Sequence, residues 1–358
     1  RSACRFYTKR YNSDHLKREC VAAARLLTVD HPLARWFDGF AECDVSLVIA
    51  PFLAHFVREH CVEILTSMIQ AEFFLTDHDI DYVFARGNTD IESLGILLAQ
   101  NHRNNKKNVC VQHAGSCLAG DAMSIYDTNT YDAILTRDPI THSYFLNATP
   151  IIKEKKVYCS PHYLFQIKKK YARSKPIKSN KIIYVQKKFF NRIKNYQEND
   201  YPFAWYFDFQ KAIINFFDRY TRLCDDEFIY KHSIRQIWAN ESVIPYIRSL
   251  NNPRLKIETA HFLKSFGKAD RIIVDYPSGA FFEAAVSAKS ILCIFPDSFS
   301  VNPKAVQLCG NSLQAFKDIP DAIEKIEKYV RSDPDDYRVN MPIALDYHLI
   351  NKFFVENP

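Results

Sequence analysis

Short β-branched runs alternate with amphipathic helical stretches along most of the chain after residue 80. In the first half, four strands are predicted at Tyr82–Arg86, Val109–His113, Ala133–Thr136 and Lys156–Cys159. Two helices are predicted among them, at Asp90–His102 and Pro139–Leu146. Strands that alternate with helices are typical of a parallel sheet, so we expect an α/β fold.

The second half repeats this alternation. Its predicted strands are Lys181–Gln186, Phe228–Lys231, Leu255–Glu258, Arg271–Asp275 and Ser290–Phe295. Its predicted helices are Phe207–Arg222, Ser242–Leu250, His261–Phe266, Gly279–Ala288, Ile319–Arg331 and the closing helix Ala344–Val355. Two further helices are predicted before residue 80, at Ser13–Leu27 and Ala54–Gln70.

A length of 358 residues with 47% apolar content favours two domains. We expect a Rossmann-like domain over 1–167, a basic linker over 168–180, a second Rossmann-like domain over 181–340 and a carboxyl-terminal helix over 341–358. The two doubly wound sheets would face a central cleft. The chain begins at Arg1, so we expect a piece of a longer protein. No apolar run reaches the length of a membrane span.

The distribution of charge and the cysteine content indicate which partners and which cellular compartment to expect. The stretch Ile151–Lys194 holds fourteen Lys and Arg residues against one acid, Glu154, although the whole chain has a net charge of only +6. This stretch is a solvated face, a phosphate-facing surface between domains, or a patch for an anionic membrane or nucleic acid. Nucleic acid is the least favoured, since no zinc finger, RRM signature or basic recognition helix is present. The ten cysteines have no metal-ligand spacing and indicate reduced thiols in a cytosolic protein.

One segment, Asp270–Phe295, is predicted to form a complete strand, turn, helix and strand. The unpaired N–H groups of a helix start favour an anion, and Gly279 would let a ligand approach the backbone. Glu283 could reach a sugar hydroxyl beside a bound phosphate. An ordinary crossover with a Ser278–Gly279 cap and a solvated Glu283 explains the same pattern.

Glycines are rare, with eight in the chain, and Gly87, Gly115 and Gly279 each follow a predicted strand. Strand ends of this kind line the ligand crevice of a doubly wound sheet. Around the first two glycines we expect cleft or acceptor residues, namely Arg86, Gly87, Asn88, Gln112, Gly115 and Ser116. His113 lies among them. It is either a structural histidine or a group that contacts phosphate or transfers a proton.

Lys231 and His232 end another predicted strand and suit a phosphate ester, although a surface Lys–His pair near a turn reads the same way. The pair Asp79 and Asp81 forms a D-x-D sequence that can hold a divalent metal. These acids precede their strand and should lie at its amino end, away from the crevice. No metal is therefore expected at this pair. We also expect no cofactor.

Residues 80–300 resemble GT-B glycosyltransferases that make bacterial capsules and lipopolysaccharides. The likeness rests on Gln112–Gly115, on Lys231–Ser233, and on a donor-binding segment with Asp275, Tyr276, Pro277, Ser278, Gly279, Glu283, Ala284, Lys289 and Ser290. Departures are Ala114 within the His-Gly turn, Ser233 in place of Pro and Gly279 in place of Thr. The resemblance therefore leaves a CMP-linked and a UDP-linked sugar both open as donor.

The resemblance implies a metal-independent transfer of a sugar to a surface glycan or lipid-linked precursor at the inner face of a membrane. The residues implied for donor binding are Lys231, His232, Tyr276, Pro277, Ser278, Gly279 and Glu283. For the acceptor side we favour His113 as the base, with Asp90 and Asp138 as the other candidates. A CDP-glycerol-type phosphotransferase, a nucleotide-sugar 2-epimerase and a non-catalytic GT-B-like scaffold are the competing functions.

Overall fold

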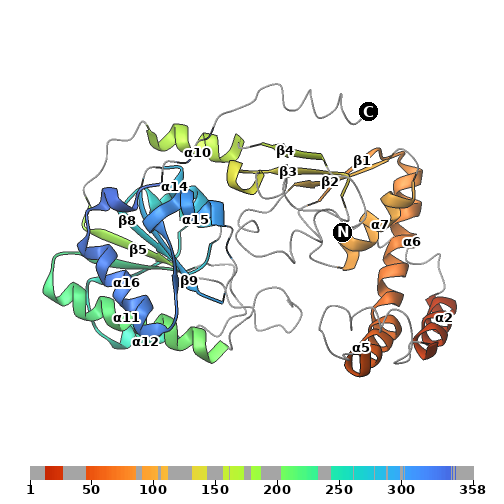
Figure 1. The fold of residues 1–358 in the computed structure, drawn as a ribbon, viewed down its shortest axis with the longest axis horizontal. Helices are drawn as coiled ribbons and strands as arrows, with labels where there is room; N and C mark the ends of the chain where they lie inside the picture. The colour runs from red at the N-terminus through yellow and green to blue at the C-terminus, as the bar shows by residue number, and fades with distance from the viewer. Residues whose placement is uncertain are drawn as a thin grey trace. The chain divides into compact units, whose positions relative to one another are not determined.

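The computed structural model describes residues 13–26, 46–85, 91–103, 106–111, 131–142, 156–160, 162–172, 179–186, 203–232, 243–260, 262–277, 279–287, 289–298, 301, 303–339, 341 and 343. The chain divides into two compact units (Figure 1). The first comprises Arg1–Val111, Tyr126–Ile134 and Ile152–Lys156. The second comprises Gln112–Ile125, Leu135–Ile151 and Val157–Pro358.

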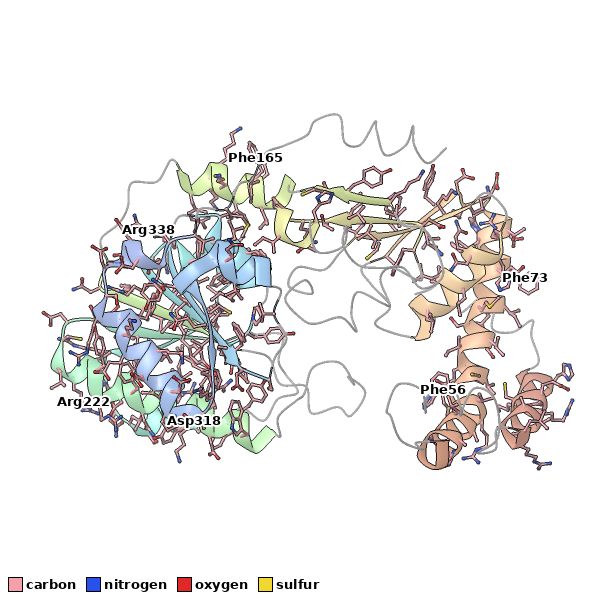
Figure 2. All side chains as sticks on the ribbon, in the orientation of Figure 1. Phe56, Phe73, Phe165, Arg222, Asp318 and Arg338 are labelled. Atoms are coloured by element: carbon pink, nitrogen blue, oxygen red, sulfur yellow. The ribbon has the colours of Figure 1, made fainter. Side chains whose placement is uncertain are left out.

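The first unit begins with helices. They are α2 (Ser13–Leu26), α5 (Ser46–Glu59), α6 (Cys61–Asp77) and α7 (Ile91–His102). The helix predicted over Ala54–Gln70 covers the end of α5 and the start of α6, and His60 alone separates them. Phe56 on α5 and Phe73 on α6 are among the exposed apolar side chains (Figure 2).

Helices α6 and α7 pack so closely that a side chain on Gly95 of α7 would have no room. A Cβ there would lie 2.3 Å from Ser67 Oγ and 2.8 Å from the backbone nitrogen of Met68, both on α6. Ala71 and Ala99 are buried in the same contact. Small residues on both helices therefore allow the close approach.

A parallel sheet follows, with strands β1 (Tyr82–Ala85), β2 (Lys107–Val111), β3 (Ala133–Thr136) and β4 (Lys156–Cys159) in the order β1-β2-β3-β4. Strands β1 and β2 pair in parallel, with Ala85 opposite Cys110. The division between the units passes through β3. Residues 139–142 are helical after β3, in agreement with the start of the predicted helix.

The second unit contains a six-stranded sheet in the order β10-β9-β8-β5-β6-β7, with every neighbouring pair parallel. Its strands are β5 (Lys181–Val185), β6 (Glu227–Lys231), β7 (Leu255–Glu258), β8 (Arg271–Val274), β9 (Ser290–Pro296) and β10 (Leu313–Phe316). The five strands predicted for this half are confirmed to within one residue at each end. Strand β10 was not predicted, because Leu313–Phe316 carries the polar Gln314 and lacks β-branched residues.

Helices cover both faces of this sheet (Figure 1). They are α10 (His162–Ala172), α11 (Phe203–Leu223), α12 (Val243–Ser249), α13 (Phe262–Phe266), α14 (Gly279–Ala285), α15 (Pro303–Cys309) and α16 (Ile319–Arg331), with 3-10 turns η2 (Gly310–Ser312) and η3 (Pro334–Tyr337). The predicted closing helix Ala344–Val355 lies outside the described residues. Asp318 caps α16 by accepting a hydrogen bond from the Asp321 N–H at 2.8 Å (Figure 2).

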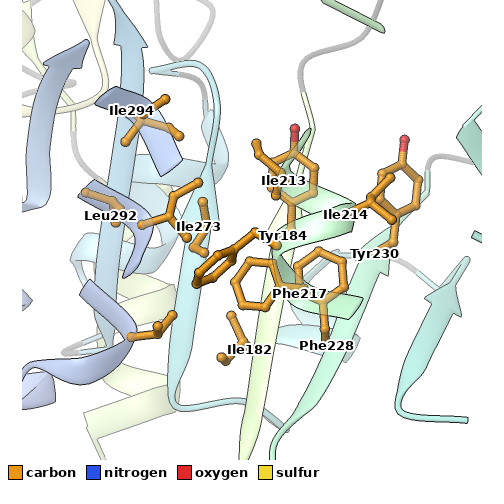
Figure 3. Close-up of a cluster of buried hydrophobic side chains, with 14 of the residues drawn as sticks. Ile182, Tyr184, Ile213, Ile214, Phe217, Phe228, Tyr230, Ile273, Leu292 and Ile294 are labelled. Atoms are coloured by element: carbon orange, nitrogen blue, oxygen red, sulfur yellow. The ribbon is translucent and has the colours of Figure 1, made fainter. Parts of the chain in front are cut away.

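Successive residues of the central strands face opposite layers of the core. Ile272 and Val274 of β8 pack in the cluster that contains α14 and α15, whereas Ile273 packs with α11 and α16. Figure 3 shows part of the second cluster around Tyr184, Phe217 and Phe228. A strand that is buried on both faces reads as a continuous apolar run, which is why β8 and β9 were recognisable in the sequence.

The predicted basic linker starts inside a helix. Lys168–Ala172 form the end of α10, and Leu164 and Ile167 of that helix are buried in the core of the second unit. The lysines suggested a linker, but they lie on an amphipathic helix whose apolar side is covered. Among the described residues, no helix combines the length and the apolar character needed to cross a membrane.

Candidate functional site

The six-stranded sheet has a point where its strand order reverses. Counted from β5 in chain order, the strands run 3-2-1-4-5-6 across the sheet, and the reversal lies between the neighbours β5 and β8. In doubly wound sheets, ligands bind outside the carboxyl ends of the strands at this point. The carboxyl ends here are Val185 and Val274, which are directly paired.

The segment that leaves β8 is the predicted donor-binding turn. Asp275 is buried and Pro277 is buried, whereas Tyr276 is half-buried. Gly279 begins α14, which ends at Ala285 rather than at the predicted Ala288. Ser278 lies outside the described residues. The turn thus stands at the reversal point, and the phosphate contacts predicted for it stay predictions.

Lys231 does not project into solvent, as a lysine that binds a phosphate would. It is the last residue of β6, and only 7% of it is exposed. Its Nζ donates to the carbonyl oxygen of His232 at 2.6 Å and to that of Glu258 at 3.3 Å. The ammonium group therefore links the residue that follows β6 to the last residue of β7, and it places a positive charge near the carboxyl ends of these strands.

His232 lies beside this ammonium group. Its backbone N–H donates to the Glu258 carbonyl oxygen at 2.9 Å, which continues the pairing of β6 and β7 by one residue. Burial, and then the nearby charge of Lys231, lower the pKa of the His232 imidazole below its ordinary value. At neutral pH the ring is consequently uncharged, and it can offer a phosphate a hydrogen bond but no positive charge.

Glu283 sits half-buried in the middle of α14. Its charge helps to raise the pKa of Tyr171 on α10, after the larger effect of burial. The Tyr171 hydroxyl donates to the Leu263 carbonyl oxygen at 2.7 Å. The carboxylate is therefore close enough to α10 to act on Tyr171, and the predicted contact with a ribose stays a prediction.

Asp138, one of the three acceptor-side candidates, is 2% exposed. Its carboxylate accepts hydrogen bonds from the Thr141 N–H at 2.8 Å and from the Thr141 hydroxyl at 2.6 Å. Burial raises the pKa of Asp138 despite these bonds. This geometry is that of a capped first helical turn, so the expectation that Asp138 faces a cleft is wrong.

The other acceptor-side residues lie outside the described part of the chain. They are Arg86, Gly87, Asn88, Asp90, Gln112, His113, Gly115 and Ser116. The strands that precede them, β1 and β2, are adjacent and parallel, so both segments leave the same edge of the first sheet. Their roles stay predictions.

The D-x-D sequence is engaged by a lysine. Lys106 Nζ donates to Asp79 Oδ1 at 3.0 Å and also bonds Asp81 Oδ1. Asp81 immediately precedes β1, and Lys106 immediately precedes β2. The expectation that these acids lie at the amino end of their strand is confirmed.

Sequence reasoning missed Tyr184, which lies inside the apolar run of β5. It is fully buried, and its hydroxyl donates to Asp275 Oδ2 at 2.6 Å. The hydroxyls of Tyr184 and Tyr230 point to the same side of the cluster (Figure 3). A tyrosine within a buried strand was the available signal, because a buried phenol needs a hydrogen-bond partner.

Comparison with known proteins places the fold. No protein-family model matches the chain, and no curated protein matches its sequence. Among solved structures, it is similar to UDP-GlcNAc 2-epimerase from Methanocaldococcus jannaschii in complex with UDP-GlcNAc and UDP, with a TM-score of 0.54 and 14% identity over 84% of this chain and 81% of that one. The chain has the GT-B fold.

Two other GT-B structures match more weakly. Trehalose-6-phosphate synthase from Burkholderia multivorans has a TM-score of 0.46 and 10% identity, over 78% of this chain and 71% of that one. MurG from Acinetobacter baumannii has a TM-score of 0.37 and 13% identity, over 85% of this chain and 70% of that one. The predicted fold class is confirmed by the likeness to the UDP-GlcNAc 2-epimerase structure, which at 14% identity concerns the fold alone.

Proposed function

We propose that this GT-B protein is a metal-independent glycosyltransferase that takes a sugar from a CMP- or UDP-linked donor. The acceptor would be a bacterial surface glycan, as in capsule or lipopolysaccharide synthesis, or its lipid-linked precursor. The observation that carries the proposal is the reversal point between β5 and β8, where the Tyr276–Gly279 turn follows β8 directly. Nucleotides bind at this point in doubly wound sheets.

The charge near this point suits a departing nucleotide. Lys231 supplies a positive charge at the carboxyl end of β6, held by the two carbonyl oxygens described above. His232 supplies an uncharged ring that can donate a hydrogen bond to a phosphate oxygen. Preorganised donors of this kind stabilise negative charge as it develops on a leaving group. In this mechanism Lys231 acts through its charge near the strand ends while His232 makes the direct contact.

The acceptor side of the proposed reaction needs a base. His113 remains our first candidate and Asp90 the second, because both follow strands that end at one edge of the first sheet. The lysines Lys168, Lys169 and Lys170 at the end of α10 would favour an anionic lipid-linked acceptor or the anionic inner face of a membrane. We place the protein in the cytoplasm, in peripheral contact with that surface.

One competing function is favoured by a specific observation. One similar solved structure, with a TM-score of 0.54, is a UDP-GlcNAc 2-epimerase. An epimerase of this type would need the same donor-binding edge but no acceptor. The second candidate is therefore a nucleotide-sugar 2-epimerase.

A panel of CMP-, UDP-, GDP- and CDP-linked donors tests the donor class by thermal unfolding. A ligand present at a hundred times its Kd should stabilise the folded protein by about 2.7 kcal/mol. We expect a CMP- or UDP-linked sugar to do so. Stabilisation by CDP-glycerol alone would indicate a phosphotransferase, and no stabilisation by any member of the panel would refute both candidate functions.

Two glycine variants, measured in the same experiment, test whether the donor binds at the turn. Gly279→Ala adds a methyl group where the donor phosphate is proposed to approach the backbone, and it should weaken binding about tenfold. Gly267→Ala is the matched control, since a Cβ there would meet only the Tyr171 ring at 3.7 Å. Incubation of a bound donor without acceptor then separates the reactions. An epimerase changes the sugar configuration, whereas a transferase releases nucleotide only when acceptor is added.

A further inference from the structure

The buried pair Tyr184 and Asp275 joins the two strands at which the sheet order reverses. Tyr184 lies on β5, Asp275 follows β8 directly, and the hydroxyl-to-carboxylate bond measures 2.6 Å. The Asp275 N–H also points to the Val185 carbonyl oxygen at 3.4 Å. One side-chain bond and one longer main-chain contact thus link the end of β5 to Asp275, the residue that precedes the turn.

The two groups are buried almost completely, with 0% of Tyr184 and 1% of Asp275 exposed. Burial, and then the charge of Asp275, raise the pKa of the Tyr184 hydroxyl well above its ordinary value. The hydroxyl therefore stays protonated and remains a donor to the carboxylate. A buried polar pair is often no more stabilising than apolar residues of the same size, so stability alone gives no reason for it.

What the pair can do is fix the direction in which the chain leaves β8. Asp275 is followed directly by Tyr276 and the buried Pro277 of the turn, so a shift of Asp275 would also move these two residues. Hydrogen bonds to a charged group hold geometry better than apolar contacts, because they are directional. Tyr184 thereby sets the position of the turn relative to the end of β5.

We propose that Tyr184 and Asp275 are positioning residues that hold the Tyr276–Gly279 turn in the geometry that binds the nucleotide phosphates of the donor. This inference rests on the proposed function, because it assigns the ligand of that same site. Neither side chain touches the ligand. Both act through the turn.

A matched control lies near the amino end of β8. Tyr329 of α16 is also fully buried, its hydroxyl accepts from the Ile272 N–H at 3.0 Å, and it donates to the Ser290 carbonyl oxygen at 2.9 Å. Ile272 lies near the amino end of β8, and Ser290 begins β9. Tyr329→Phe therefore removes a buried hydroxyl from the opposite edge of the sheet.

The test compares Tyr184→Phe with Tyr329→Phe in the full chain. Affinity for CMP and UDP is measured by calorimetry, and the unfolding midpoint is measured separately. Both variants should lower the midpoint, because each removes a buried hydrogen bond. Only Tyr184→Phe should weaken nucleotide binding, by about tenfold, while Tyr329→Phe stays within about twofold of the wild type.

Asp275→Asn provides the conservative variant, because its amide oxygen can still accept the Tyr184 hydrogen bond. Its affinity should stay within about threefold of the wild type. If Tyr184→Phe does not fold, the double variant Tyr184→Phe/Asp275→Asn takes its place, since it leaves no buried charge without the tyrosine.

Three results decide the matter. A wild type that binds neither nucleotide overturns the proposed function itself, and this inference with it. A wild type that binds, with Tyr184→Phe binding equally well, overturns the positioning role alone. A loss of about tenfold or more in Asp275→Asn would also overturn it, because the charge of Asp275 rather than its bond to Tyr184 would then matter.

Discussion

The variant Lys231→Met tests whether Lys231 stabilises the fold or serves mainly to bind phosphate. The ammonium group donates to the His232 and Glu258 carbonyl oxygens at 2.6 and 3.3 Å, and the side chain is almost fully buried. Methionine has a similar length but no donor, so both carbonyl groups would lose this partner. Hydrogen bonds that involve a charged group contribute about 1.5–3 kcal/mol each, and the longer of the two should contribute less.

We therefore expect the free energy of unfolding to fall by about 2–4 kcal/mol in Lys231→Met. The measurement is denaturant unfolding at constant pH, with the slope against denaturant compared between the proteins to verify that the transition is unchanged. Lys325→Met is the matched control. Lys325 pairs with Asp321 one turn away on α16, where both side chains are half-buried, and helix pairs at this spacing contribute about 0.3–0.5 kcal/mol.

The opposite result would refute the structural role. A lysine whose main task is to meet phosphate carries an unfavourable buried charge when the ligand is absent, so its replacement by methionine should leave stability unchanged or increase it. If Lys231→Met is as stable as the wild type but loses nucleotide affinity, the two carbonyl contacts do not determine its role. If stability and affinity both fall, Lys231 supports the edge and supplies its charge.

Three further predictions follow from other parts of the molecule. Because the folded pKa of His232 lies below 6.5, its contribution to stability is complete above pH 6.5 and is lost as the pH falls, and His232→Gln should reduce this dependence in unfolding titrations. Gly95→Ala should lower the free energy of unfolding by about 1–3 kcal/mol through overpacking against Ser67, whereas Gly267→Ala should change it little. Replacing Lys168, Lys169 and Lys170 with Gln should weaken binding to anionic vesicles at low salt and have little effect at high salt. If the variant binds as well as the wild type at both salt levels, these lysines belong to a solvated surface.

The sequence alone determined the local elements and the place of the turn. The apolar runs at Ala133–Thr136 and Lys156–Cys159 became β3 and β4 with the predicted bounds, and Ile319–Arg331 became α16. Strands buried on both faces and amphipathic helices leave a period that depends only on nearby residues. The break after Val274 was equally local, since a proline and a glycine follow the run closely.

The tertiary structure decided what the polar residues near these elements do. Lys231 and Asp138 looked like groups that face a ligand, but one bonds two carbonyl oxygens and the other caps a helical turn. Burial of a polar side chain depends on the elements packed over it, and a single sequence does not show which elements these are. The linker was expected to start at Lys168, but Lys168–Ala172 end α10, and Leu164 and Ile167 of that helix lie in the core.

Pairs far apart in the chain were out of reach of any local pattern. Tyr184 and Asp275 are 91 residues apart and meet because β5 and β8 are neighbours in the sheet. Ser67 and Gly95 meet because two helices pack at close range. A periodic pattern states which side of an element is buried, but it does not state against what. The order of the strands supplies that information, and with it the position of the candidate site.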